Sequence, residues 1–455
     1  MAASIGDHQV INPRTLALVT ALLGAPFRDG TAQHASQAPP VVIENVNVVP
    51  MDRPRVLTRQ TVVVEGGFIA RMGSTSSVRA PAGAHVVDGS GKFLIPGLAD
   101  VHVHLSYSDE NEQRHILSMF VVNGVTSVLN MRGAPQTLEL RSAVAGGRVL
   151  GPTIYTVGPY INEPFVTTPA EVERAVVEQR RAGYDFVKLH GDLSRDAYSR
   201  LNAVARREGI RVVGHAPRNL GLAAMFEGRQ YAVAHAEEFL YDQNNSSRNF
   251  QQVEPRIPDL ARSMVDAGIW LMPNLTAYEI IGLMAGDLDA VLARPEMKFL
   301  PRPRRESWGP ATNPYTARFG PDAYPRFMQR LALLQKLVRS FHAAGVRLLI
   351  GTDAMNTGVV PGFSTHDELA ELVVAGLTPF EALRAATSNA AGFFGRGNQR
   401  GVVAVGQTAD LVLLDANPLE NIANSRRIAG VMLRGRWLDR ADLASILATL
   451  ESPGN

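Results

Sequence analysis

Short alternating runs of apolar and polar residues mark both ends of the chain. After Val41 come "VVIENVNVV", "TVVVEGGFIARMG" and "AHVVDGSGKFLI", which are rich in β-branched residues and broken by turn residues. The same pattern returns near the C-terminus in "VGQTADLVLLDANP" and "IAGVMLRGRWL". Such segments are typical of antiparallel strands. We therefore predict a small composite β-sandwich domain, built from residues 41–96 and 399–442.

Residues 97–398 follow a different pattern, in which apolar strand-like runs alternate with amphipathic stretches. The stretch "TTPAEVERAVVEQRRAG", for example, starts with Thr-Thr-Pro and ends in Gly, as helices do. Eight such units predict a closed parallel (β/α)8 barrel, an α/β fold. A doubly wound open sheet is the rival, but no glycine-rich dinucleotide-binding turn is found in the sequence. The strand candidates are "LADVHVHL", "TSVLNMR", "TIYTVGP", "FVKLHG", "RVVGHAP", "AVAHAEEF", "IWLMPNL" and "RLLIGTDA".

The connection after the seventh strand candidate runs from Thr276 to Gly345, far longer than the usual few residues. It holds the Pro- and Arg-rich tract "FLPRPRRESWGPATNPY". Loops of this length commonly form lids or substrate walls, and a solvated irregular insertion is the alternative.

Polar residues stand at the ends of the strand candidates. The first ends with His102 and His104, whose side chains project together because residues i and i+2 of a strand face the same side. Active sites of barrels lie at the carboxyl ends of the strands, so these groups are expected to converge in one pocket. The other strand-end residues are Lys188, His190, His215, His235 and Asp353.

Each of these residues also has a purely structural interpretation. A lone strand-end histidine is more often a hydrogen-bonded packing residue than a ligand, Lys188 could extend its amine to solvent, and Asp353 could cap a helix. The joint pattern favours function, because the chain has 11 histidines and four of them, in addition to His190, occupy the carboxyl ends of predicted strands.

The composition narrows the chemistry. With 45% hydrophobic and 19% charged residues over 455 positions, the chain is expected to be soluble and globular. A net charge of +2, with scattered basic residues, gives no sign of nucleic-acid binding. The sequence has no cysteine, which excludes disulfides, thiolate metal sites and cysteine nucleophiles. Any metal must therefore be held mainly by histidine and carboxylate.

Residues 1–40 have the features of a leader. The run "RTLALVTALLGAPF" has an apolar centre behind a positive charge, and small residues and prolines follow it. It is too short to span a membrane but resembles the central part of an export signal. A periplasmic or secreted location is therefore favoured over a cytoplasmic one, and a loose N-terminal helix is the alternative.

The motifs "GLADVHVHL", "FVKLH", "VVGHA", "VAHAEE" and "LIGTDA" follow one another in an order that resembles the metal-dependent amidohydrolase superfamily. The resemblance is to its imidazolonepropionase-like branch, which includes prolidase-type dipeptidases, and it extends from about Val41 to Leu438. It implies a (β/α)8 barrel with a composite β-sandwich.

The resemblance also implies a binuclear centre of two divalent metal ions, bridged by Lys188. A lysine ammonium offers only hydrogen-bond donors, but in binuclear members carbon dioxide converts this lysine into a carbamate, which is an oxygen ligand. Zinc is the metal expected for imidazole and oxygen ligands, although manganese, cobalt and iron also suit them. One ion would be held by His102, His104 and Asp353, and the other by His215 and His235.

The implied activity is hydrolysis of an amide bond in a small molecule, such as a dipeptide or N-acyl amino acid, by a metal-bridging hydroxide. Asp353 is expected to act as general base and then as general acid. The candidate substrate contacts are Arg132, His190 and Tyr278. Each also has a structural interpretation: Arg132 could form a loop salt bridge, His190 could donate a hydrogen bond to a metal ligand, and Tyr278 could pack in the core.

Other functions stay open on the sequence alone. A mononuclear deaminase or cyclic-amide hydrolase, or a lactone or ester hydrolase, fits the same superfamily. A non-catalytic binding protein on the same barrel is a further alternative. A homo-oligomer is compatible with the resemblance.

Overall fold

Seven short parallel strands and one bridging segment close into a barrel. The computed structural model describes residues 39–105, 109–241, 252–320 and 322–451, so nearly all of the predicted leader lies outside the described residues. Three groups of strands pair in parallel, in the orders β6-β7-β8, β9-β10 and β11-β12. The strands are β6 (Leu98–Val103), β7 (Val125–Asn130), β8 (Thr153–Thr156), β9 (Phe186–Leu189), β10 (Arg211–Gly214), β11 (Ala232–Ala234) and β12 (Trp270–Met272).

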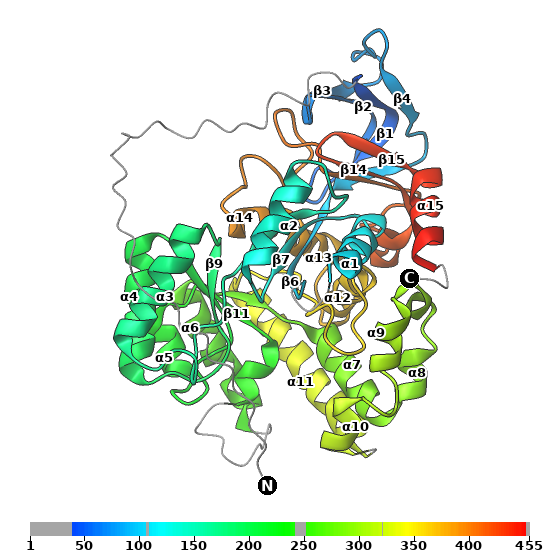
Figure 1. Ribbon diagram of the computed structural model, residues 1–455. Coiled ribbons are helices and arrows are strands. Elements are labelled where there is room, and N and C mark those ends of the chain that lie inside the picture. Colours follow the sequence, from blue (N-terminus) through cyan, green and yellow to red (C-terminus); the bar gives the residue numbers. More distant parts are fainter. Residues whose placement is uncertain (1–38, 106–108, 242–251, 321, 452–455) are drawn as a thin grey trace, which may run out of the picture. The chain divides into compact units, whose positions relative to one another are not determined.

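Single backbone contacts join these groups into a ring. A parallel bridge links Val157 to Phe186, and Tyr231 donates its backbone N–H to Val212. Residues 347–354 form the eighth segment without being a continuous strand: they bridge to β12 through Leu348 and to β6 through a hydrogen bond from the Val101 N–H to the Ile350 carbonyl. All eight strand candidates therefore take their predicted places in a closed parallel (β/α)8 barrel, with helices between them (Figure 1).

The helices between the strands begin and end at the residues that the sequence marks. In α3, Thr168 accepts a hydrogen bond from the Glu171 N–H, the Glu171 carboxylate accepts one from the Thr168 N–H, and Gly183 ends the helix at φ 89°. This reciprocal pair satisfies amide groups that a helix start leaves open. The helices between the first seven strands are α1 (Glu110–Val122), α2 (Pro135–Ala145), α3 (Pro169–Ala182), α4 (Arg195–Glu208), α5 (Leu222–Gly228) and α6 (Ile257–Ala267).

The long seventh connection is helical, which contradicts the alternative of a solvated irregular insertion, whereas its role as a lid or substrate wall stays a prediction. Several of its prolines fall in the first turns of helices, where a missing N–H costs nothing: Pro303 is the second residue of α9 and Pro314 is the first residue of α10. The connection consists of α7 (Leu275–Gly286), α8 (Leu288–Leu292), the 3-10 helix η5 (Pro295–Phe299), α9 (Arg302–Ser307), α10 (Pro314–Phe319) and α11 (Ala323–Ala344).

Three helices follow the eighth segment, and a histidine in the first of them makes hydrogen bonds to residues outside these helices. These are α12 (Phe363–Val374), α13 (Pro379–Ala386) and α14 (Ser388–Phe393). In α12, buried His366 contacts the Ser425 hydroxyl and the Asn123 carbonyl, so it is a packing residue.

Among the described residues, no helix is both long enough and apolar enough to cross a bilayer.

Strands from both chain ends pair in one sheet, as the sequence predicts. β13 lies between β5 and β14 and pairs antiparallel with both, which places blue and red strands side by side in Figure 1. The sheet is mixed and not purely antiparallel, because β1 pairs in parallel with β4 and β5. Its two-layer arrangement as a sandwich, and the domain boundaries at 97 and 398, stay predictions. The strands are β1 (Val41–Val48), β2 (Leu57–Glu65), β3 (Phe68–Ser74), β4 (His85–Asp88), β5 (Phe93–Pro96), β13 (Leu411–Leu414), β14 (Ile428–Leu433) and β15 (Arg436–Asp439), and helix α15 (Arg440–Glu451) follows them.

Candidate metal centre and active site

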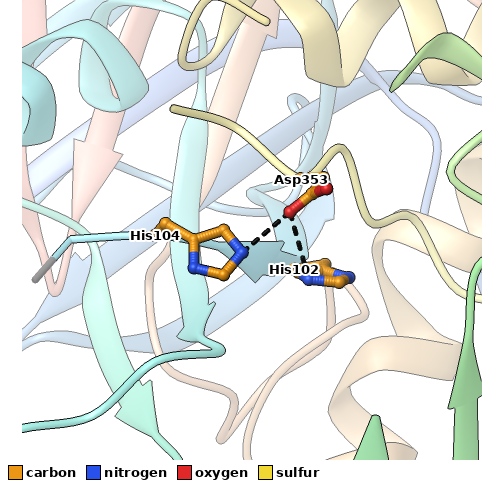
Figure 2. A group of neighbouring side chains, drawn as sticks. All are labelled: His102, His104 and Asp353. Atoms are coloured by element: carbon orange, nitrogen blue, oxygen red, sulfur yellow. Dashed lines mark hydrogen bonds and ion pairs between the residues drawn. The ribbon is translucent and has the colours of Figure 1, made fainter. Parts of the chain in front are cut away.

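His102, His104 and Asp353 meet at the carboxyl end of the barrel. The Nε2 atoms of His102 and His104 lie 3.2 Å and 2.8 Å from Asp353 Oδ1, and both rings point toward this carboxylate (Figure 2). All three side chains are buried, and one ligand atom from each lies within 4.8 Å of the others. The backbone fixes this arrangement, since the Asp353 N–H donates to the His102 carbonyl across the closing seam of the barrel.

Lys188 reaches the same place from β9. Its side chain is 1% exposed, and its Nζ lies 3.4 Å from His102 Nε2, so the amine is not turned out to solvent. Phe186, two residues earlier, packs in the core cluster of the barrel interior, which explains why Lys188 faces inward. Burial lowers the pKa of Lys188 to about 8, and the nearby positive charge of Arg132 acts in the same direction.

Three more histidine rings extend the cluster. The ring of His235 lies 4.9 Å from those of His102 and His215, measured between ring centroids, and His190 lies 5.0 Å from His215. The structure thus brings all six predicted metal ligands and His190 to one pocket of about 200 Å³. The other lining residues are Glu237, Pro273, Asn274, Ala277, Tyr278, Ile281, Leu334 and Asn356.

The charges of the cluster suit a bound cation. Burial lowers the pKa of His102 well below its usual value, and it lowers the pKa values of His190 and His235 to about 3, so these imidazoles are neutral and keep a lone pair. Burial alone would raise the pKa of Asp353, but His102 and His104 hold it well below its usual range, so Asp353 is an anion. Neutral imidazole nitrogens beside a buried carboxylate are the donor set of a divalent metal site.

Glu238 is a functional residue that the sequence reasoning missed. Its carboxylate is fully buried and lies 2.7 Å from His215 Nδ1, and it also accepts three hydrogen bonds from the Arg218 guanidinium. Burial alone would raise the pKa of Glu238, but His215 and Arg218 lower it to about 2. A charged carboxylate only accepts, so His215 carries its proton on Nδ1 and leaves Nε2 as an acceptor. The second glutamate of "VAHAEE" was the available signal.

Asp100 was missed as well. Its buried carboxylate accepts hydrogen bonds from the His102 N–H, from the N–H and hydroxyl of Thr352, and from the Thr365 hydroxyl. Thr352 precedes Asp353, so one carboxylate ties together the two segments that carry the three-residue cluster.

The candidate substrate contacts differ in their placement. His190 lines the pocket and stacks on Tyr160, with 4.2 Å between ring centroids, and Tyr278 lines the pocket from α7. The Arg132 guanidinium lies 5.7 Å from the centroid of the Tyr160 ring, and Arg132 is not among the residues that line the pocket.

Comparisons with known proteins identify the family of the chain. The family model "Amidohydrolase family" matches residues 93–438. The enamidase of Eubacterium barkeri is 23% identical over 81% of this chain and 84% of its own length. The imidazolonepropionase of Geobacillus sp. (strain WCH70) is 25% identical over 84% of this chain and 88% of its own length.

A solved structure shows the same fold. A Xaa-Pro dipeptidase with methionine bound in its active site superposes with a TM-score of 0.66 at 18% sequence identity, over 88% of this chain and all of that chain. A family match over most of the chain, together with the barrel, establishes the membership. The chain belongs to the Amidohydrolase family and is a hydrolase that acts on carbon–nitrogen bonds.

Proposed function

We propose that the protein is a binuclear metallohydrolase that cleaves the amide bond of a small molecule, such as a dipeptide or an N-acyl amino acid. The observation that carries this proposal is Lys188, a lysine amine buried beside His102 and Asp353. An unmodified ammonium group there would repel a bound cation, whereas a carbamate anion would bind it.

The lowered pKa of Lys188 supports its carboxylation. With a pKa of about 8, a usable fraction of the amine is neutral near pH 7, and only the neutral amine has the lone pair that attacks carbon dioxide. The new N–C bond forms as the nitrogen loses a proton, which gives a carbamate and a hydrogen ion. Zinc ions would be held by His102, His104 and Asp353 on one side and by His215 and His235 on the other, with the carbamate between them.

Asp353 is the proposed general base. Bound divalent ions supply Lewis acidity, which acidifies water and polarises a carbonyl group. Asp353 Oδ1 faces the two histidines, while Oδ2 accepts a hydrogen bond from the Asn356 amide and is the oxygen that can take a proton. The same oxygen would return that proton to the leaving amine, which converts a poor leaving group into a neutral one.

His190 and Tyr278 line the pocket and would contact the bound substrate. Stacking on Tyr160 holds the His190 ring in one orientation next to His215. Its low pKa keeps this imidazole neutral, so it contributes a hydrogen bond and not a charge.

A panel of dipeptides and N-acyl amino acids, incubated with the zinc-loaded protein, tests the activity. We expect hydrolysis by the wild type and a loss of at least about a hundredfold in Lys188→Ala and Asp353→Asn, because each loses a metal ligand or the proton carrier. Full activity in either variant would contradict the assignment. Mass spectrometry of the intact chain after bicarbonate treatment checks the added carbon dioxide independently.

A single-metal deaminase or cyclic-amide hydrolase is the second candidate. It is favoured by one observation: within the described part of the chain, His102, His104 and Asp353 are the one group whose three ligand atoms come within 4.8 Å of one another. Elemental analysis separates the two candidates, since one tightly held metal ion per chain would favour the second.

A further inference from the structure

The pocket has a second wall that the proposed metal centre does not use. Helices α7 and α11 form it, and its surface is largely apolar. One acidic side chain, Glu237, lines the pocket without belonging to the proposed ligand set. Glu237 comes from the 3-10 helix η2 (Ala236–Leu240), two residues after His235. The residues of the wall itself are Ala277, Tyr278, Ile281 and Leu334.

Glu237 takes no part in the ion pairs that hold this region together. The adjacent Glu238 makes those contacts, and Arg218 is occupied by its three hydrogen bonds to Glu238. In the ranges that the structure describes, the Glu237 carboxylate has neither a hydrogen bond nor an ion pair. Burial and the nearby acids Glu238 and Asp353 raise the pKa of Glu237 to about 7, and Arg218 and Arg330 oppose this rise through longer-range electrostatic interactions.

A carboxylate in this position is costly without a partner. Glu237 is half-buried, and a polar group that loses water without gaining a hydrogen bond raises the free energy of the folded state. Its position on the pocket wall lets a bound ligand supply the missing donor. The complementary group is a cation with N–H donors, which forms a charge-assisted hydrogen bond with a carboxylate.

The chemistry of the proposed substrates identifies that cation. In a dipeptide, the protonated α-amino group is separated from the scissile carbonyl by a single carbon atom. Glu237 lines the same pocket as His235 and Asp353, so it lies near the reacting centre. An N-acyl amino acid or an N-acetylated dipeptide has no positive charge at this place.

We propose that Glu237 binds the α-ammonium group of the substrate, so that the enzyme prefers dipeptides with a free amino terminus to N-acylated compounds. The side chain of the amino-terminal residue then lies against Ile281 and Leu334, which favours an apolar residue there. This inference rests on the proposed function and narrows its substrate class from two candidates to one.

The test compares leucyl-alanine with N-acetyl-leucyl-alanine, which share the scissile bond and differ in the charge at the amino terminus. We expect kcat/KM of the zinc-loaded wild type to favour the free dipeptide by at least about tenfold, as one charge-assisted hydrogen bond does. In Glu237→Gln this ratio falls towards one, mainly through a higher KM for the free dipeptide. Glu237→Asp, which keeps the charge on a shorter side chain, retains part of the preference.

Glu279→Gln is the matched control. Glu279 is also a half-buried carboxylate, in the neighbouring helix α7, but it does not line the pocket, so this variant keeps the wild-type ratio. Metal content is measured for every variant, so that a lost ion is not mistaken for a lost contact.

Two outcomes overturn the inference: equal kcat/KM for the two compounds in the wild type, or a preference that persists in Glu237→Gln. The first needs no variant, so a folding defect in Glu237→Gln leaves the inference testable. Failure to hydrolyse either compound contradicts the proposed function itself, and that result is distinct from a lost preference.

Discussion

His215 donates its Nδ1–H to Glu238 Oε1 over 2.7 Å, and the carboxylate that receives it is fully buried. Removing the charge of Glu238 while keeping its shape is therefore expected to disturb His215 more than the fold. In Glu238→Gln, the amide can present N–H to His215 and favour the tautomer that blocks Nε2. We predict a loss of about 10–100-fold in the affinity of one of the two zinc ions, measured by competition with a chelating indicator.

Glu112→Gln serves as the control for that experiment. Glu112 also accepts two hydrogen bonds from an arginine, Arg304, but within the described residues no histidine forms a hydrogen bond or ion pair with it. Unchanged affinity for both zinc ions in Glu238→Gln would show that the contact does not orient a ligand. Unchanged affinity in His215→Ala would instead remove His215 from the metal site.

The contacts of Asp100 predict a stability effect at the closing seam of the barrel. Thr352→Val removes the hydroxyl that donates to Asp100 Oδ2 over 2.6 Å and preserves the side-chain shape. We expect the free energy of unfolding to fall by about 1–3 kcal/mol, because a buried acceptor loses a donor. Urea denaturation measures this. A change of a few tenths of a kcal/mol would show that the remaining donors satisfy the carboxylate.

Glu368 predicts a pH dependence of stability. Its buried carboxyl group accepts hydrogen bonds from the N–H groups of Leu275 and Thr276 at the start of α7, yet burial raises its pKa to about 8 from an ordinary 4.5. The folded state therefore binds a proton that the unfolded state releases between these two pH values. The contribution of Glu368 to stability is complete below pH 4.5 and is lost as the pH rises through about 8.

The variant Glu368→Gln tests whether the contribution of Glu368 to stability falls as the pH rises. The N–H groups of Leu275 and Thr276 donate to different oxygens of Glu368, and in glutamine one of these oxygens is replaced by an NH2 group that cannot accept. The variant is therefore less stable than the wild type at pH 5, and the difference shrinks as the pH approaches 8. The slope attributable to one proton is at most about 1.4 kcal/mol per pH unit. Parallel stability curves for the two proteins, from urea denaturation at several pH values, would contradict the prediction.

Metal removal predicts a change in thermal stability. Chelation leaves the Asp353 anion in a buried cluster without a divalent cation, and a ligand that binds only the folded state raises its stability by mass action. We expect dialysis against a chelator to lower the melting temperature and zinc to restore it. His102→Ala provides the control, since zinc should restore far less of its melting temperature. Equal recovery in both proteins would place the stabilising metal elsewhere.

Local sequence patterns predict most of the barrel and its cluster. The alternation within "ADVHVH" places His102 and His104 on one face, and the spacing of apolar runs orders eight segments, including 347–354, which pair only through bridges. The helices in the seventh connection could not be predicted from the sequence, because prolines occur both in loops and in the first turns of helices. Asp100 and Glu238 are not predictable in the same way, since the partners of Asp100 include Thr352, 252 residues away.

The joint sheet also has a consequence for the order of synthesis. β5 emerges from the ribosome more than 300 residues before β13, the strand that pairs with its edge. During that interval the amino-terminal strands have an open edge, and such edges are where nascent chains aggregate. The amino-terminal strands therefore complete their sheet only after the barrel has been synthesised, when β13 pairs with β5 and covers its open edge.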